Sequence, residues 1–489
     1  MAEYSVATKI LKSSIWQYLG SWLNKIIGFV STIILARILV PDDFGIVAAA
    51  SIVTGVFHVV ATVGTEQYLI RKKEISDSEL NTGWTINVIM NSMAAIGIFL
   101  LASPIANYMA DDRLILVLQI ISISSLLAGF NNIGLVLYQK EFNYQPNFYI
   151  SVISRVVGFV VKIILALYFQ NYWAFIIAEI LEVTIFMIGS FIAHPYRPQF
   201  SLANWKQQWL FSQWILLKSI FVFLRFRIDN ILISHYLPIE ALGKYTIAKD
   251  LAILPAEQII SPIMQPLYVG LSEGQDNELL FAARVHKCIA LLFIVIIPIS
   301  FGIYATADNL VYVLLGEKWL DTVPLVMVIS WTLIPSVLGD LFTRIMTVKG
   351  KVKLIFKIEF FLGLLTICTF LFFAENMTLL DFAKLRVITI MINTFIVLVT
   401  VIQISKLSLI RIIGLILPPF IASAAMLYLL VSIGPVLSRY DNEIQFVVQV
   451  FIGITIYICL ISSFVYLLRN SVKEYLFVWE IFNLSSFLR

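Results

Sequence analysis

The sequence predicts an all-α, polytopic membrane protein with about fourteen transmembrane helices. Mean hydropathy over the 489 residues is +0.92, and 60% of the residues are hydrophobic. Charged residues make up 13% of the chain, whereas soluble proteins carry roughly 25%. Apolar stretches of about 20 residues recur from end to end, and each can cross a hydrocarbon core of about 30 Å as a helix.

The expected helices follow one another with short loops between them. They cover residues 13–37, 42–66, 82–105, 113–139, 147–169, 172–193, 209–235, 240–271, 279–304, 321–346, 353–374, 381–404, 411–432 and 444–468. Proline limits helices, and the expected boundaries are marked by Pro41, Pro104, Pro146, Pro238 and Pro435. The longest expected loops, 66–81 and 305–320, are too short to form separate domains.

The distribution of Lys and Arg predicts the orientation. With a cytoplasmic N-terminus, 20 of the 34 Lys and Arg residues fall on the cytoplasmic side, 7 in outer loops and 7 within helices. Cytoplasmic loops of membrane proteins carry such an excess. We therefore expect an even number of helices and two cytoplasmic termini. We also expect the N-terminal segment to stay as the first helix, because it has no small-residue cleavage site.

Two hairpins show a weak internal repeat. ARILVPDDFGIVAAAS (36–51) and SHYLPIEALGKYTIAKD (234–250) are offset by about 198 residues. Each has a Leu and a Pro, then an acidic residue, then a bulky apolar residue followed by Gly. Both turns are expected on the outer side, which indicates two parallel six-helix lobes, 1–206 and 207–406, followed by two further helices and a cytoplasmic tail in 407–489. Alternatively, this residue pattern simply favours any helical hairpin.

Charges within the expected helices are the candidates for function, because a charge at the bilayer centre costs about 2.5–3.5 kcal/mol and needs a partner or water. In the stretch 223–236, Arg225 and Asp229 are four residues apart and share a helix face, whereas Arg227 points elsewhere. We expect one arginine to pair with Asp229 and the other to remain available for an anion. An internal salt bridge without a substrate role is the alternative.

Further charges lie on other expected helices. Arg155 and Lys162 are seven residues apart on one face, and a pair of Lys162 with Glu179 or Glu182 is as plausible as a substrate role. Lys25 and the arginines of 223–236 would face one shared cavity if the lobes are related by symmetry. We predict two sets of site residues: Lys25, Arg155, Lys162, Arg225, Arg227 and Lys249 for substrate binding, and Asp229, Asp250 and Glu257 for coupling or charge pairing.

Signatures of other functions are missing from the sequence. It has no GxxxxGK[ST] phosphate loop, and its three cysteines and four histidines lack metal-ligand spacing. No block of Lys and Arg indicates nucleic acid. We therefore expect no catalytic residue, no metal and no cofactor, and coupling to an H⁺ or Na⁺ gradient stays open. Basic cavity residues favour an anionic amphiphile whose tail stays in the lipid.

Five stretches form a more specific pattern. They are ILARILVPDDFGIVAAASI (34–52), GTEQYLIRKKEISDSELNTGW (64–84), YRPQFS (196–201), RIDNILISHYLPIEALGKYTIAKDLAILP (227–255) and LVYVLLGEKWLDTVPLV (310–326). With these stretches the chain resembles the polysaccharide flippases, in the lipopolysaccharide and exopolysaccharide translocase branch of the multidrug/oligosaccharidyl-lipid/polysaccharide exporter superfamily. Arg227 and Asp229 lie inside the matched pattern, whereas Lys25, Arg155 and Lys162 lie outside it.

The resemblance implies two six-helix lobes around a central cavity and transport by alternating access. The implied substrate is an oligosaccharide repeat unit linked to polyprenyl diphosphate, which is carried across the cytoplasmic (inner) membrane for cell-surface polysaccharide synthesis. The implied partners are membrane lipid and the polysaccharide polymerase or export machinery.

Two other functions fit the composition. A cation-coupled drug or small-molecule antiporter of the same superfamily would favour acidic cavity residues. A membrane-embedded glycosyltransferase or polysaccharide polymerase would need a larger extramembrane loop with catalytic carboxylates or Arg.

Overall fold

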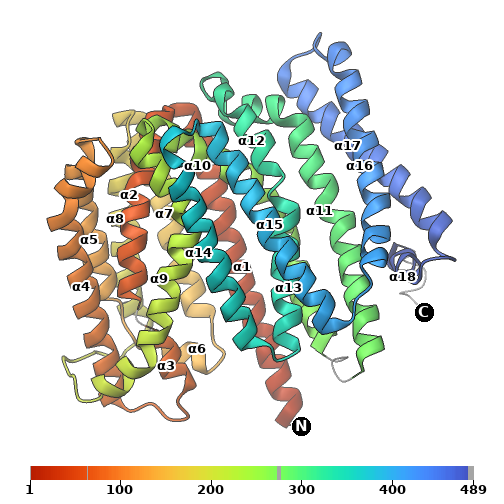
Figure 1. The fold of residues 1–489 in the computed structure, drawn as a ribbon. Coiled ribbons are helices and arrows are strands. Elements are labelled where there is room, and N and C mark those ends of the chain that lie inside the picture. Colours follow the sequence, from red (N-terminus) through yellow and green to blue (C-terminus); the bar gives the residue numbers. More distant parts are fainter. Residues whose placement is uncertain (1, 63, 273–276, 483–489) are drawn as a thin grey trace. The chain divides into compact units, whose positions relative to one another are not determined.

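The computed structural model describes residues 2–62, 64–272 and 277–482. All regular secondary structure in these ranges is helical, which confirms the predicted fold class (Figure 1). The chain forms two compact units, residues 1–244 (unit 1) and 245–489 (unit 2).

Unit 1 is built from long helices that pack pairwise. Its helices are α1 (Ala2–Ile38), α2 (Pro41–Ala61), α3 (Thr65–Arg71), α4 (Asp77–Tyr108), α5 (Arg113–Gly129), α6 (Leu135–Lys140), α7 (Gln145–Phe169), α8 (Trp173–Ala193), α9 (Trp205–Tyr236) and the start of α10 (Ile239–Ser272). Helix α4 packs on α5, α7 packs on both α1 and α8, and α9 packs on α2, α3 and α4. Because α9 contacts α2, unit 1 extends beyond residue 206. The predicted lobes 1–206, 207–406 and 407–489 stay a prediction.

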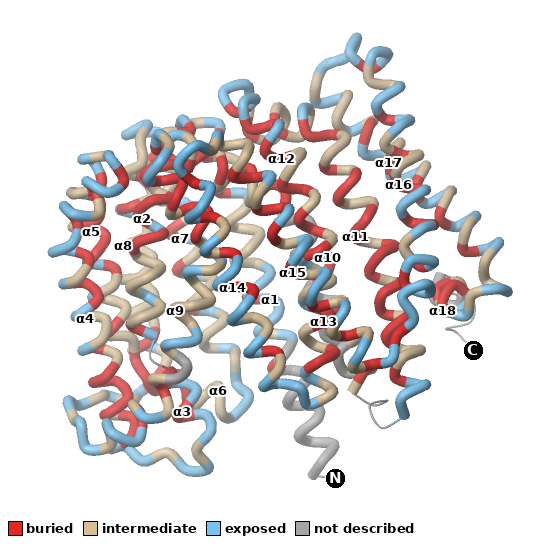
Figure 2. Tube along the Cα trace, in the orientation of Figure 1, coloured by how far each residue is buried: buried red, intermediate tan, exposed pale blue. Residues whose placement is uncertain are grey.

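Unit 2 is organised around one central helix. It comprises the rest of α10 and then α11 (Glu278–Leu315), η1 (Glu317–Thr322), α12 (Val323–Ser330), α13 (Leu333–Val348), α14 (Val352–Phe373), η2 (Ala374–Asn376), α15 (Leu379–Ser405), α16 (Leu409–Leu437), α17 (Asn442–Leu468) and α18 (Lys473–Phe482). Helix α11 contacts α12, α13, α15, α16, α17 and α18. Figure 2 shows that buried residues follow the length of α11. Phe281, Phe293 and Phe301 are among the buried side chains of this helix.

The predicted transmembrane ranges agree with the observed helices. Each range coincides with one helix or with two consecutive helices, as where 113–139 divides into α5 and α6, and 321–346 into α12 and α13. Within the described residues, 11 helical stretches are long and apolar enough to span a membrane. Helices α5, α9 and α10 are not among these stretches. The protein is therefore a multi-pass membrane protein, and the number fourteen stays a prediction.

Some predicted helix ends were wrong. Pro104 lies inside α4 and Pro435 inside α16, because neighbouring helices and local adjustments satisfy the backbone groups that a proline frees in an apolar helix. The expected loop 305–320 consists mostly of the end of α11 and η1. Helix α11 continues to Gly316, which has a positive φ of 94° that favours glycine.

The start of α4 forms hydrogen bonds with the segment that follows α8. These bonds connect residues 64–84 with residues 196–201, two of the stretches that carry the family resemblance. The Oδ1 atom of Asn81 accepts hydrogen bonds from Oη of Tyr196 (2.6 Å) and from the backbone N of Gln199 (2.7 Å). The Oγ1 atom of Thr85 accepts one from the backbone N of Ser201 (2.9 Å). Burial raises the pKa of Tyr196 to about 12, so its hydroxyl stays a donor at neutral pH.

We expect Asn81→Ala to lower the stability of purified protein by about 1–3 kcal/mol, because the backbone N of Gln199 loses its acceptor and Oη of Tyr196 keeps only the carbonyl oxygen of Asp77 at 3.3 Å. Asn81→Asp keeps an acceptor oxygen and should unfold close to wild type in thermal scans in detergent. Equal melting temperatures for Asn81→Ala and wild type would show that the contact does not hold the segment.

Candidate functional site

A polar cavity lies between α1, α7 and α8 in unit 1. Its volume is about 480 Å³, and it is lined by Asn24, Ser151, Ser154, Arg155, Lys162, Glu179, Glu182, Val183 and Phe186. A second cavity of about 80 Å³ shares Arg155, Lys162 and Glu182 with the first. All three helices are apolar and long enough to span a membrane. Four charged side chains thus gather where burial in lipid would be costly, which makes this cavity the strongest candidate site.

Arg155 forms an ion pair with Glu182 across the interface of α7 and α8. Its Nη1 atom lies 3.1 Å from Oε1 and 3.3 Å from Oε2 of that carboxylate. Two glycines leave room for the pair. A Cβ at Gly28 of α1 would lie 3.1 Å from Nη2 of Arg155, and one at Gly158 of α7 would lie 3.0 Å from Oε2 of Glu182. Small residues on α1 and α7 therefore fit the charged pair between the helices.

Lys162 lies seven residues after Arg155 on α7 and lines both cavities. Its Nζ atom is 5.3 Å from the ring centroid of Phe175, a distance typical of a cation–π contact. Among the described residues, the ion pair at this site joins a glutamate to Arg155, and Lys162 forms no salt bridge. The two basic and two acidic side chains carry no net charge when all four are ionised, so positive and negative groups lie side by side in the cavity. Of the two glutamates that we considered as partners of Lys162, Glu182 pairs with Arg155 instead.

The other predicted site residues of unit 1 lie outside this cavity. Lys25 is next to Asn24 on α1 but does not line either cavity. On α9, Arg225 and Arg227 are half-buried, and Asp229 is fully buried and accepts a hydrogen bond from the backbone N of Asn230 (3.0 Å). The predicted pair of Arg225 and Asp229 stays a prediction.

Three predicted residues belong to α10 in unit 2. Lys249 is half-buried, with Nζ 5.8 Å from the ring centroid of Tyr245, and Asp250 is exposed. The side chain of Glu257 lies outside the described residues. The predicted cavity shared with Lys25 and the α9 arginines stays a prediction.

Sequence reasoning missed several residues of the cavity. Asn24 donates through Nδ2 to Oγ of Ser151 (2.7 Å), and neither residue was predicted. Ser151, Arg155 and Lys162 follow one face of α7, so the polar positions on that face were the available signal. Glu182 was recognised as a charged companion, but it was not included among the site residues.

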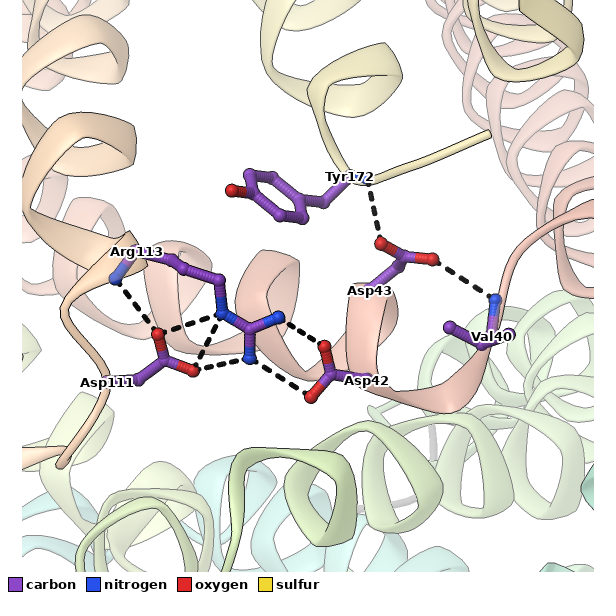
Figure 3. A network of polar contacts seen from close by, with 6 residues as sticks. All are labelled: Val40, Asp42, Asp43, Asp111, Arg113 and Tyr172. Atoms are coloured by element: carbon purple, nitrogen blue, oxygen red, sulfur yellow. Dashed lines mark hydrogen bonds and ion pairs between the residues drawn. The ribbon is translucent and has the colours of Figure 1, made fainter. Parts of the chain in front are cut away.

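A second polar cluster fixes the start of α2 (Figure 3). Asp42 binds the guanidinium of Arg113, the first residue of α5, with Nη2 of Arg113 3.1 Å from Oδ1 of Asp42. Arg113 also binds Asp111 through Nε (3.0 Å). The neighbouring carboxylate of Asp43 accepts from the backbone N of Tyr172 (3.0 Å), just before α8. Two carboxylates in one helical turn therefore connect α2 to α5 and α8.

The two repeat hairpins meet at their glycines, and both contacts lie within unit 1. A Cβ at Gly45 would lie 2.1 Å from the carbonyl oxygen of Ile239, and a Cβ at Gly243 would lie 2.1 Å from that of Pro41. Pro41 and Ile239 occupy equivalent positions of the 198-residue repeat, as do Gly45 and Gly243. The contact is therefore reciprocal, as a two-fold relation produces. Neither glycine can accept a side chain without moving backbone.

The comparisons with known proteins agree with these observations. Residues 34–324 match a family model described as "Polysaccharide biosynthesis protein". The chain is 22% identical over 365 residues to the lipopolysaccharide biosynthesis protein WzxC of Escherichia coli (strain K12), covering 73% of each chain. It is 26% identical over 294 residues to the succinoglycan biosynthesis transport protein ExoT of Rhizobium meliloti (strain 1021), covering 60% of this chain and 59% of that protein.

A solved structure shares the fold. It is the lipid II flippase MurJ in an inward closed conformation, which is 15% identical, has a TM-score of 0.77 and covers 94% of this chain and 99% of its own. This similarity concerns the fold alone. The family model extends over more than half of the sequence. The chain therefore belongs to the polysaccharide biosynthesis protein family.

Proposed function

We propose that this protein is a flippase that moves an oligosaccharide repeat unit, linked to polyprenyl diphosphate, across the cytoplasmic membrane by alternating access. Family membership and two relatives whose names specify polysaccharide biosynthesis support this function. The observation that carries the proposal is the charged cavity within membrane-spanning helices, lined by Arg155 and Lys162. It offers polar contacts to a head group at a depth where lipid offers none.

The ion pair suggests how a head group would bind. Arg155 is held by Glu182 through one guanidinium nitrogen, and a diphosphate can replace that carboxylate because guanidinium also donates to phosphate oxygens. Lys162 adds a second cation on the same face, and Asn24, Ser151 and Ser154 offer hydrogen-bonding groups to sugar hydroxyls. In this proposal the substrate competes with Glu182 for Arg155.

The same competition provides a route for coupling. An ion that binds at Glu182 would weaken the hold of this carboxylate on Arg155, and it would thereby change how tightly Arg155 holds the anion. Glu179 lies in the same cavity and would take a similar role. We propose that an H⁺ or a Na⁺ gradient drives transport through these two carboxylates. Transport into vesicles with the two gradients collapsed separately tests this choice.

We further propose that both termini are cytoplasmic and that the protein acts in the inner membrane. A repeat unit delivered to the outer side would then be used by a polymerase or by the export machinery.

The test is a gene deletion in the native host, complemented with wild type or variants. The deletion should abolish surface polysaccharide and accumulate the lipid-linked oligosaccharide on the cytoplasmic side. Lys162→Gln should slow transport about 10- to 100-fold, the loss expected for one charged hydrogen bond. Lys162→Arg should retain most of the rate.

Lys218→Gln is the matched control, because Lys218 is an exposed lysine of α9 outside the cavity. The control should transport normally at equal membrane abundance. Normal surface polysaccharide in the deletion strain would exclude the proposed function. Full activity of Lys162→Gln in a strain that depends on the protein would exclude the cavity as the binding site while leaving the function intact.

A further inference from the structure

We infer that unit 2 contains a binding site for the head group of an anionic membrane phospholipid, between α10, α11 and α18. A cavity of about 270 Å³ lies there, with Arg284 and Lys287 of α11 as its charged residues. Leu267 of α10, Leu291 of α11 and Phe477 of α18 form apolar parts of its wall. The inference does not depend on which substrate the protein transports.

Both cations are held in place by neighbouring helices. Arg284 and Lys287 are three residues apart on α11 and share a face. Nη1 of Arg284 donates to the carbonyl oxygen of Gly270 on α10. Nζ of Lys287 lies 4.4 Å from the ring centroid of Phe477. An ammonium group has three N–H donors, and a cation–π contact does not occupy all of them. Lys287 can therefore still donate a hydrogen bond to a phosphate.

Helix α18 is a fixed wall of this cavity. The carboxylate of Glu474, whose side chain is 1% exposed, pairs with Arg411 of α16 (2.8 Å). Oη of the fully buried Tyr475 donates to the carbonyl oxygen of Leu415 (3.0 Å). The guanidinium carbon of Arg469 lies 4.9 Å from the ring centroid of Trp479. These contacts fix the turn that carries Phe477, so the cavity is formed before a ligand enters.

The combination of groups identifies the class of ligand. Two cations suit a phosphate, and the leucines beside them suit the first part of an acyl chain. A free phosphate would gain nothing from the apolar wall. Arg284 and Lys287 belong to the loop and helix start that the Lys/Arg distribution predicts to be cytoplasmic. Basic pockets between transmembrane helices on that side bind anionic head groups, and the leaflet there is rich in them.

The experiment uses the purified full-length protein and native mass spectrometry in detergent, with a thermal scan as a second readout. The probes are phosphatidylglycerol, phosphatidylcholine, inorganic phosphate and a polyprenyl phosphate. We expect phosphatidylglycerol to bind and to raise the melting temperature, whereas phosphatidylcholine and inorganic phosphate should do neither. The double variant Arg284→Gln/Lys287→Gln should bind phosphatidylglycerol at least about tenfold more weakly, because the phosphate loses both charged donors.

Two further variants separate the role of the apolar wall from that of the charges. Leu267→Trp retains both cations but fills the apolar part of the cavity, so it should also weaken phosphatidylglycerol binding. Lys353→Gln/Lys357→Gln removes the same charge from exposed positions of α14 and should bind like wild type. If the double cavity variant fails to fold, Lys287→Gln and Leu267→Trp carry the comparison.

Three results would overturn the inference. Equal binding of phosphatidylglycerol and phosphatidylcholine would mean that charge is not recognised. Inorganic phosphate binding as tightly as phosphatidylglycerol would mean a simple anion site. Tighter binding of polyprenyl phosphate would assign the cavity to the carrier lipid instead.

Discussion

Gly45→Ala should destabilise the protein by about 3 kcal/mol, at the upper end of the usual cost of overpacking. The added methyl group would meet the carbonyl oxygen of Ile239 at 2.1 Å, and a backbone oxygen in the first turn of a helix cannot rotate away. The starts of α2 and α10 must therefore separate. Gly243→Ala should cost a similar amount, because it meets Pro41 in the same way. Thermal unfolding of the purified variants measures both effects.

Gly302→Ala is the matched control for these variants. Gly302 also lies in a helix, but a Cβ there meets nothing within 4 Å. This change should leave stability equal or raise it by about 0.5–1 kcal/mol, the intrinsic preference of a helix for alanine. The double variant Gly45→Ala/Gly243→Ala should cost less than the sum of the singles, because both disturb one contact. If Gly45→Ala unfolds like Gly302→Ala, the reciprocal contact is not part of the folded state.

Breaking the ion pair of Arg155 and Glu182 should have the second large effect. Removing one partner of a buried pair leaves a charge without compensation and costs about 3–5 kcal/mol. The lower end of this range applies here, because the side chains of Arg155 and Glu182 are 36% and 23% exposed. Arg155→Ala and Glu182→Ala should each destabilise by about 3 kcal/mol, and Arg155→Ala should also abolish transport.

The double variant Arg155→Ala/Glu182→Ala should lose less stability than the sum of the losses of the two single variants, because no uncompensated charge remains. A double-mutant cycle on thermal or denaturant unfolding measures this coupling. The pair of Lys406 and Glu278, whose side chains are 72% and 61% exposed, is the control, and its coupling should be much smaller. A coupling of Arg155 and Glu182 no larger than that of the control would mean that the pair is not maintained in the membrane.

The positions of the helices were predictable because hydropathy is a local property of the sequence. The ends of α4, α11 and α16 were not, because they depend on contacts with neighbouring helices. Pro104 and Pro435 are accommodated within helices, and α11 continues until Gly316 allows a positive φ. A proline is thus a weaker boundary signal in an apolar helix than in a soluble one.

The candidate site was predictable in part. The spacing of Arg155 and Lys162 placed both on one face of a helix, and the structure places both in one cavity. Spacing does not give the relative height of two neighbouring helices, so the sequence suggested Lys162 as the partner of a glutamate, whereas the structure pairs Arg155 with Glu182. Asn24 and Ser151 were missed because uncharged polar residues are common in apolar helices and carry little signal. The repeat indicated that Gly45 and Gly243 are equivalent, but not that they lie against each other's hairpin.

That reciprocal contact has a consequence for biosynthesis. The Pro41–Gly45 turn is made early, whereas its partner at residues 239–243 emerges 198 residues later. At a translation rate of about 5–20 residues per second, the first hairpin waits for about 10–40 s inside the membrane before its neighbour arrives. During that interval Gly45 lacks the backbone that packs against it, so the assembly of unit 1 is completed only after the ribosome has read nearly half of the message.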